Sequence, residues 1–222
     1  QSFPQYVGRF VLDGAIDPNV AIEDQTRIQA VAFDQAIKNF IKDCTQQKDC
    51  PLPKGVTPAF FTDLFNKVAQ TPLTAGDRKI TEGQVVTGTA SALYDDVSGW
   101  PSLRTAITQA LVGDGTTFAE LSDTYSGRNE DGTYKNNEND ANVVIECLDW
   151  HQRQSNNQIK AKAPSFSRYA PVFGPYVAYG GITCNLLNQS IGRTQTTTRN
   201  LKKIKSIATP VLVIGTTQDP AT

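Results

Sequence analysis

The same short pattern stands near both ends of this chain, and it constrains the fold more than any other feature. An apolar run, Phe10 to Leu12 or Val211 to Ile214, is followed by a glycine and then by an Asp-Pro pair, Asp17-Pro18 or Asp219-Pro220. Contiguous apolar residues of this kind are typical of strands that are buried on both faces of a parallel sheet. The chain is therefore predicted to begin and end in two strands of one sheet.

The sequence between the two runs is predicted to be mainly helical. Ile22 to Thr45 carries apolar residues at spacings of three and four, with Asp24 as the expected N-cap, and Thr57-Pro58 is expected to start a second helix. Further helices are predicted over 81–94, 100–111 and 156–169, and a short one through Tyr125 with Asp114 or Thr116 as its cap. Residues 141–150 fit either a short helix or an extended segment. A parallel strand pair needs a crossover of only about a dozen residues, so the excess predicts an inserted helical subdomain.

Charge and hydropathy exclude several classes of protein. The 222 residues hold 21 Lys and Arg against 22 Asp and Glu, which argues against a nucleic-acid partner or a charged membrane surface. No run of the sequence approaches the roughly 18 apolar residues of a spanning helix.

The four cysteines predict two disulfides. Cys44 and Cys50 flank a short polar loop, and Cys147 and Cys184 form the second expected pair. The loop-entropy relation gives roughly 2 kcal/mol for the short loop and about 4 kcal/mol for the long one. Four cysteines allow three connectivities, and four buried thiols are the alternative. Disulfides would indicate an exported protein, and with one histidine and no C-x-x-C pair we expect no metal site.

Asp219 lies just beyond the carboxyl end of the second predicted strand. Open α/β sheets hold their ligands and catalytic groups at this edge, so Asp219 is a candidate catalytic residue. The alternative is an aspartate that satisfies a turn or caps a helix.

Three segments together resemble the tripeptidyl and prolyl aminopeptidase branch of the α/β-hydrolases, which are exported actinobacterial serine peptidases. They are residues 7–18, Cys147-Leu-Asp149 and residues 210–222. The resemblance implies an α/β-hydrolase fragment, with a mainly helical lid inserted between two adjacent parallel core strands. Residues 1–20 would form one core strand segment, 21–205 the lid, and 206–222 the other core strand with the catalytic-acid loop.

The resemblance also implies which part of an active site the chain carries. Asp219 stands at the position of the family's catalytic acid, where it would accept the Nδ1–H of the catalytic histidine. The family's G-x-S-x-G nucleophile motif is absent, and His151, the sole histidine, is not at the family's histidine position. We therefore expect a fragment that is inactive alone and that needs the missing core segments of the same protein. No cofactor is expected.

The lid of this family limits substrates to short peptides with a free N-terminus, and an α-ammonium group in a partly buried site requires carboxylates. Glu146 and Asp149, on either side of Cys147, are the candidates for this role. Surface or helix-capping carboxylates are the alternative. An aromatic run could line apolar subsites or simply pack the core. It comprises Phe166, Tyr169, Phe173, Tyr176 and Tyr179.

Three functions compete at this point. The first is a secreted or cell-envelope serine exopeptidase of bacterial origin. The second is an esterase or lipase-like hydrolase of the same fold. The third, of another class, is a non-catalytic helical interaction module. In the fragment, the two end strands are expected to pair side by side with exposed apolar faces, which favours association between copies of the chain.

Overall fold

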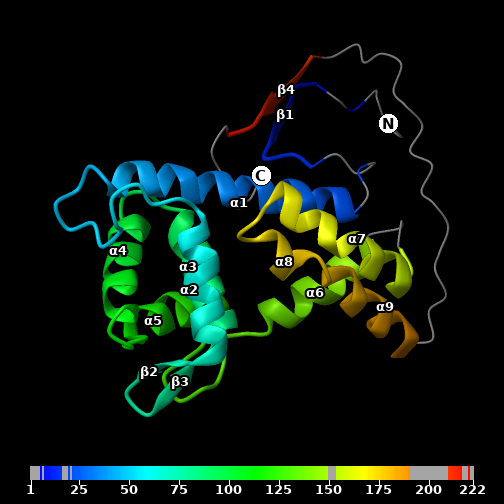
Figure 1. The fold of residues 1–222 in the computed structure, drawn as a ribbon. Helices are drawn as coiled ribbons and strands as arrows, with labels where there is room; N and C mark the ends of the chain where they lie inside the picture. Colours follow the sequence, from blue (N-terminus) through cyan, green and yellow to red (C-terminus); the bar gives the residue numbers. More distant parts are fainter. Residues whose placement is uncertain are drawn as a thin grey trace.

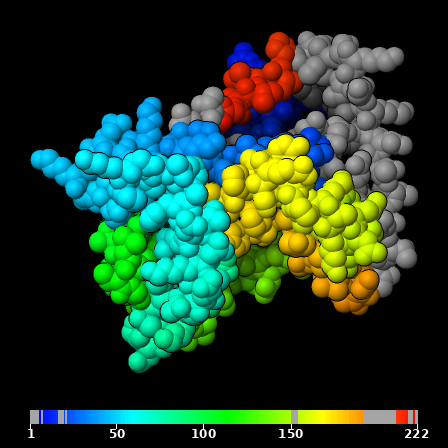
Figure 2. All heavy atoms as spheres, in the orientation of Figure 1, coloured from blue at the N-terminus to red at the C-terminus, as the bar shows by residue number. Residues whose placement is uncertain are grey.

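The two end strands pair as predicted. The computed structural model describes residues 6, 8–16, 20, 22–149, 154–190, 210–216 and 220. Strands β1 (Phe10–Asp13) and β4 (Val211–Ile214) are parallel, with Phe10 opposite Val211 and Asp13 opposite Ile214. The amide N–H of Gly14 donates to the carbonyl oxygen of Ile214 at 3.0 Å, which extends the ladder by one bond. The pair stands at the edge of the helical body (Figures 1 and 2).

The apolar side chains of these strands are exposed. Leu212 and Val213 are 57% and 61% exposed, and Val11 is 59% exposed. The expectation that each strand is buried on both faces is therefore not met within the described residues, whereas the expectation of exposed strand faces is confirmed.

Helix α1 (Ile22–Cys44) is the longest of the described elements, and α3 (Glu82–Leu93), α7 (Asn156–Tyr169) and α8 (Gly174–Val177) pack against it. Its inner face is apolar and fully buried at Ile37 and Phe40, so this stripe packs into the main core. The prediction of Asp24 as the N-cap is wrong. The helix already begins at Ile22, and Asp24 lies in its first turn, where its carboxylate pairs with Arg27 at 3.3 Å.

A first group of helices packs against the carboxyl-terminal half of α1. Phenylalanines dominate this part of the core, and the rings of Phe40 and Phe61 meet edge to face at 6.1 Å between centroids. The group contains α2 (Ala59–Gln70), α3 (Glu82–Leu93), α4 (Gly99–Ala110) and α5 (Thr116–Ser126).

The second helix starts one residue later than predicted, because Pro58 is the N-cap and Ala59 the first helical residue. The predicted capping box is present at the start of α3, where the Gln84 carboxamide oxygen accepts the backbone N–H of Thr81 at 3.0 Å.

A short antiparallel hairpin, which was not predicted from the sequence, is formed by β2 (Leu73–Ala75) and β3 (Arg78–Ile80). Each strand has only three residues, which is too few for an alternating pattern to stand out. The hairpin is stabilised by tertiary contact, because Leu73 and Ile80 are buried in the main core.

A second helical group follows a polar loop. It contains α6 (Glu138–Asp149), α7 (Asn156–Tyr169), α8 (Gly174–Val177) and α9 (Gly180–Ser190). The ambiguous 141–150 segment is thus helical as far as Asp149. Helix α6 packs on α9, and α9 packs on α7, which in turn contacts α1 (Figure 1). None of the described helices is long and apolar enough to cross a membrane.

Candidate functional site

The carboxyl ends of β1 and β4 lie at one edge of the strand pair, because the two strands are parallel and in register. This is the edge at which α/β enzymes bind substrates. Asp13 ends β1 with an exposed side chain. Asp219 and His151 lie outside the described residues, so the structure does not relate them to other groups. Pro220, directly after Asp219, is buried.

Both candidate ammonium-binding carboxylates lie on the surface of α6. Glu146 and Asp149 are exposed and stand three residues apart, so they share one side of the helix. Cys147 between them is 2% exposed and forms the predicted disulfide with Cys184 of α9, with 5.0 Å between the Cα atoms. The disulfide fixes α6 against α9 and so determines how the two carboxylates are presented.

The aromatic run divides into two sets. Phe166 and Phe173 are 5% and 3% exposed and belong to the core, whereas Tyr169 and Tyr179 are 58% and 50% exposed. Tyr176 contacts the Phe65 ring and donates a hydrogen bond from its hydroxyl to Glu82. Core packing therefore accounts for the phenylalanines, and only the tyrosines remain available to a ligand.

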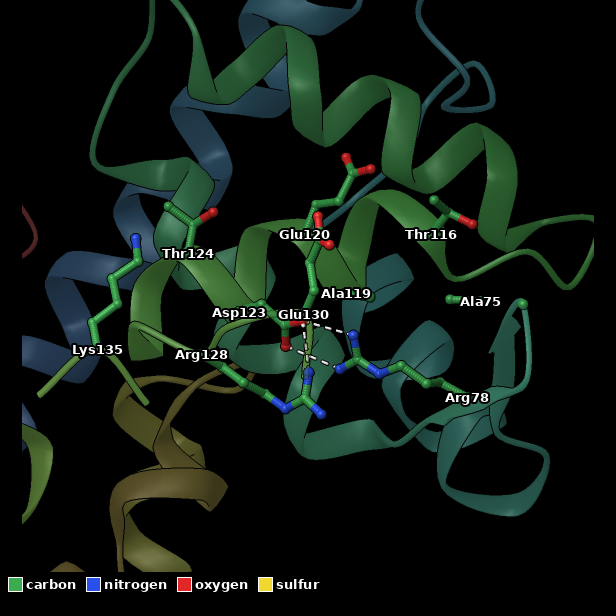
Figure 3. A pocket seen from close by; sticks show the side chains of 11 residues that line it. Ala75, Arg78, Thr116, Ala119, Glu120, Asp123, Thr124, Arg128, Glu130 and Lys135 are labelled. Atoms are coloured by element: carbon green, nitrogen blue, oxygen red, sulfur yellow. Dashed lines mark hydrogen bonds and ion pairs between the residues drawn. The ribbon is translucent and has the colours of Figure 1, made fainter. Parts of the chain in front are cut away.

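An open cavity of about 410 Å³ lies between the β2–β3 hairpin and α5 (Figure 3). At its floor the Asp123 carboxylate accepts two hydrogen bonds from the Arg78 guanidinium, at 2.6 and 3.0 Å. Arg128 approaches the same carboxylate at 3.4 Å. Figure 3 shows the two guanidinium groups converging on Asp123.

These ion pairs determine what the cavity can do. The hydrogen bonds from Arg78 hold the pKa of Asp123 below its ordinary value, and those to Asp123 raise the pKa of Arg78. A carboxylate held ionised by two guanidinium groups is a poor general base. The cluster instead ties the hairpin to α5, and because Arg78 and Asp123 are 45 residues apart no spacing rule could have predicted it.

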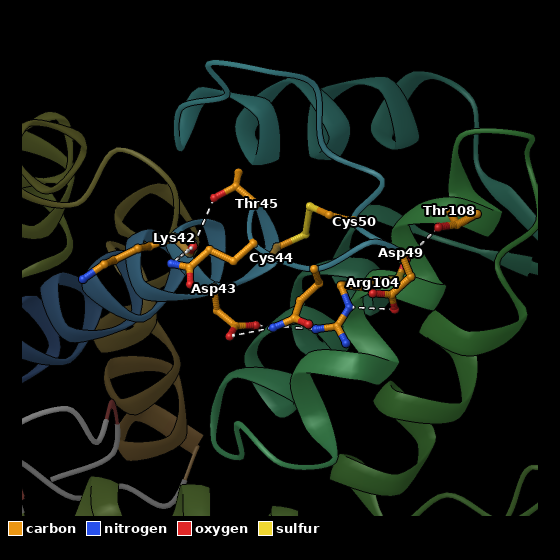
Figure 4. Close-up of a disulfide and its surroundings, with 10 residues drawn as sticks. Lys42, Asp43, Cys44, Thr45, Asp49, Cys50, Arg104 and Thr108 are labelled. Atoms are coloured by element: carbon orange, nitrogen blue, oxygen red, sulfur yellow. Dashed lines mark hydrogen bonds and ion pairs between the residues drawn. A yellow bond between two sulfur atoms is a disulfide. The ribbon is translucent and has the colours of Figure 1, made fainter.

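The other disulfide closes a short loop at the end of α1. Cys44 and Cys50 are bonded as predicted, with 5.2 Å between their Cα atoms. Arg104 of α4 contacts the Asp49 carboxylate at 2.9 Å and that of Asp43 at 3.6 Å, one on each side of the bond (Figure 4). The loop is thereby fixed to the helical body.

Asp34 is a buried carboxylate that was not among the predicted site residues. It is 3% exposed, and its two oxygens accept the backbone N–H groups of Val172 at 3.0 Å and Phe173 at 2.9 Å. Burial raises the pKa of Asp34 although these hydrogen bonds oppose the shift. A signal was present in the sequence, since Asp34 interrupts the apolar stripe between Phe33 and Ile37.

The pattern of parallel end strands around a helical insertion fits a hydrolase of the α/β class, and comparison with known proteins supports the serine hydrolases. The chain is 30% identical over 237 residues to serine protease Hip1 of Mycobacterium tuberculosis and, equally, of Mycobacterium bovis. It is 29% identical over 234 residues to carboxylesterase B of Mycobacterium tuberculosis.

Each of these alignments covers the whole chain but only 44% of Hip1 and 43% of carboxylesterase B. The chain thus spans less than half the length of the curated relatives that it matches. No protein-family profile matches it.

Proposed function

We propose that this chain is the lid and catalytic-acid segment of a serine exopeptidase that releases short peptides from free N-termini. The main support is the parallel β1–β4 pair, whose strands precede and follow the described helices in the sequence, with Asp219 five residues after the end of β4. In this proposal Asp219 orients the catalytic histidine and stabilises its imidazolium form. Similarity along the full chain to a protein named serine protease Hip1 supports the same chemistry.

Residues 21–205 roof the active site in this proposal, and the segments before 21 and after 205 belong to the catalytic core. The nucleophile and the histidine come from the rest of the parent protein, so the 222-residue chain alone hydrolyses nothing. The exposed faces of β1 and β4 are where those core segments pack. The two disulfides support an exported or cell-envelope protein, because such bonds persist in oxidising compartments.

Specificity for a free N-terminus is assigned to the carboxylates of α6. An α-ammonium group removed from water needs an opposite charge close by, and Glu146 and Asp149 are held on one side of a helix that a disulfide fixes.

The test of this assignment uses the complete parent protein and tripeptide p-nitroanilides with free or acetylated N-termini. Glu146→Ala and Asp149→Ala, made singly, are expected to lower the kcat/KM ratio of free to acetylated substrate by about tenfold or more, since each removes one of the opposite charges that an ammonium group requires once the bound substrate shields it from water. Glu138→Ala, at the far end of the same helix, is the matched control. An unchanged ratio in both variants would remove these two residues from the site.

An esterase is the second candidate, favoured by the similarity to carboxylesterase B. It would accept p-nitrophenyl esters of uncharged acids without regard to an ammonium group. The parent protein would then hydrolyse acetylated and free peptides equally slowly and esters rapidly, a pattern opposite to that expected of an exopeptidase.

A further inference from the structure

Helix α1 has a second face besides the one that packs into the core. Its exposed positions recur every three or four residues and so form one stripe along the helix. They are Asp24, Ile28, Val31, Gln35, Lys38 and Lys42. Four of the six are polar, as a solvent-facing stripe requires. Ile28 and Val31 are the exceptions, at 50% and 39% exposed.

The apolar part of this stripe faces away from the helical layer. Phe33, Ile37 and Phe40, on the inner face of α1, are buried against the other helices. Figure 1 shows the β1–β4 pair on the other side of α1 from α2, α4 and α5. Strand β1 leads into α1 through residues 14–21, which limits the distance from the end of the strand to the start of the helix to roughly 30 Å.

The polar neighbours of Ile28 and Val31 already interact with one another. Arg27 pairs with Asp24 at 3.3 Å, and its guanidinium carbon lies 5.0 Å from the centre of the Tyr169 ring at the end of α7. The two aliphatic side chains are therefore the part of this surface that is open to an apolar group, and the ion pair and the tyrosine border them.

The size of the patch indicates what it contacts. A stable protein interface buries about 800 Å² on each partner, far more than two half-exposed aliphatic side chains offer. One side chain of a peptide matches them better. Substrates of α/β enzymes lie at the carboxyl ends of the strands, and α1 is the helix that follows β1 in the chain and is drawn beside the strand pair in Figure 1.

We infer that Ile28 and Val31 form an apolar wall of the substrate site and select the side chain next to the scissile bond, preferring a large aliphatic or aromatic residue to glycine. The inference rests on the proposed serine peptidase function and adds two specificity-determining residues to it. Neither residue takes part in the chemical step.

The experiment uses the complete parent protein and a series of peptide p-nitroanilides with glycine, alanine, leucine or phenylalanine at the residue before the anilide. The double variant Ile28→Ala with Val31→Ala is expected to lower the leucine-to-glycine ratio of kcat/KM by about tenfold or more, since a single methylene in an apolar pocket changes such ratios tenfold or more. Val31→Phe, which fills the site instead, is expected to lower the acceptance of phenylalanine while glycine turns over normally.

The control is Val97→Ala, because Val97 is 81% exposed in the connection between α3 and α4. Labelling of the nucleophile by a fluorophosphonate distinguishes failure of the inference from failure of the proposed function. If the wild-type protein is labelled and cleaves the peptide p-nitroanilides, and if both the double variant and Val31→Phe keep its kcat/KM ratios, the inference is overturned and the proposed function stands. If the wild-type protein is not labelled, the proposed function fails and the inference fails with it.

Discussion

Asp34 shows how a single buried charge can join two parts of the chain. Among the described residues, Asp34 is the only charged residue that is buried. Its carboxylate accepts hydrogen bonds from the backbone N–H groups of Val172 and Phe173. These two residues lead into α8, so one side chain of α1 fixes the connection between α7 and α8 in the second helical group. Each carboxylate oxygen has its own N–H donor, and a carboxamide offers only one oxygen.

We predict that Asp34→Asn lowers the free energy of unfolding by about 1–3 kcal/mol, because one buried backbone N–H loses its acceptor. The pH dependence also changes. Since the pKa of Asp34 is raised in the folded state, the folded protein binds this proton more tightly than the unfolded chain does. The contribution of Asp34 to stability therefore falls as the pH rises from its ordinary pKa of about 3.8 through the raised folded value.

Urea unfolding across that pH range measures both the loss of stability and its pH dependence. In the Asp34→Asn variant, the free energy of unfolding should no longer show the part of its pH dependence that comes from Asp34. Asp63→Asn is the matched control, since Asp63 is exposed on α2 and such surface changes stay within about 0.5 kcal/mol. Equal stability of the Asp34 and Asp63 variants would mean that the hydrogen bonds to Val172 and Phe173 contribute nothing net.

Asp123 is predicted to titrate in the opposite sense. Its pKa is lowered in the folded state by Arg78 and Arg128, so its contribution to stability is present above its ordinary pKa and is lost as the pH falls toward the folded value. Asp123→Asn should cost about 1–2 kcal/mol at neutral pH and much less at acidic pH, measured by urea unfolding. Glu120→Gln, in the same cavity, should cost less than about 0.5 kcal/mol. Equal losses from the two variants would contradict the ion-pair account.

At the scale of elements, one disulfide joins two helices and the other closes a short loop. The bond between Cys147 and Cys184 spans 37 residues and joins α6 to α9, whereas the bond between Cys44 and Cys50 spans six residues in a loop that Arg104 also fixes. Helix α6 buries little besides Cys147, and Val143, Val144 and Ile145 on it are exposed. Its position therefore depends on the covalent bond more than on packing.

We predict that Cys147→Ala with Cys184→Ala releases α6 while the core of α1 to α5 stays folded. Hydrogen exchange should rise in α6 and α9 and remain unchanged at Ile37 and Phe40, which are fully buried. The loss of stability is expected to approach the roughly 4 kcal/mol of the loop-entropy relation, against about 2 kcal/mol for Cys44→Ala with Cys50→Ala. Unchanged exchange in α6 would show that noncovalent packing suffices.

The elements that the sequence predicted are those with a local cause. The apolar spacing of α1, the capping box at Thr81 and the pairing of Cys44 with Cys50 all follow from neighbouring residues. The pairing of Cys147 with Cys184 spans 37 residues and was predicted from the cysteine count. The β2–β3 hairpin, the cavity of Arg78 and Asp123, and the hydrogen bonds of Asp34 depend on residues far apart in the chain. No periodicity or motif encodes such contacts, so they became visible only in the folded arrangement.

At the scale of the whole molecule, the chain combines a packed helical body with a strand pair that is not covered in the described structure. Half-exposed Phe10, Val11, Leu212 and Val213 stand on a parallel sheet of two strands. Parallel sheets are normally covered on both faces, and two strands alone are marginal in water. In the proposed parent hydrolase the rest of the core covers both faces of this strand pair. Without that core, the exposed apolar side chains favour association with other molecules.

We therefore predict that the isolated chain self-associates through these strands, with a mass in light scattering that rises with protein concentration. Val11→Lys with Leu212→Lys should restore a monomer, because adjacent charges on an exposed strand oppose edge and face pairing. Val112→Lys is the control, since Val112 is 84% exposed in the turn after α4 and far along the chain from both strands. A chain that is monomeric at all concentrations would mean that its own residues protect the strand pair, and the argument that the parent's core packs there would lose its support.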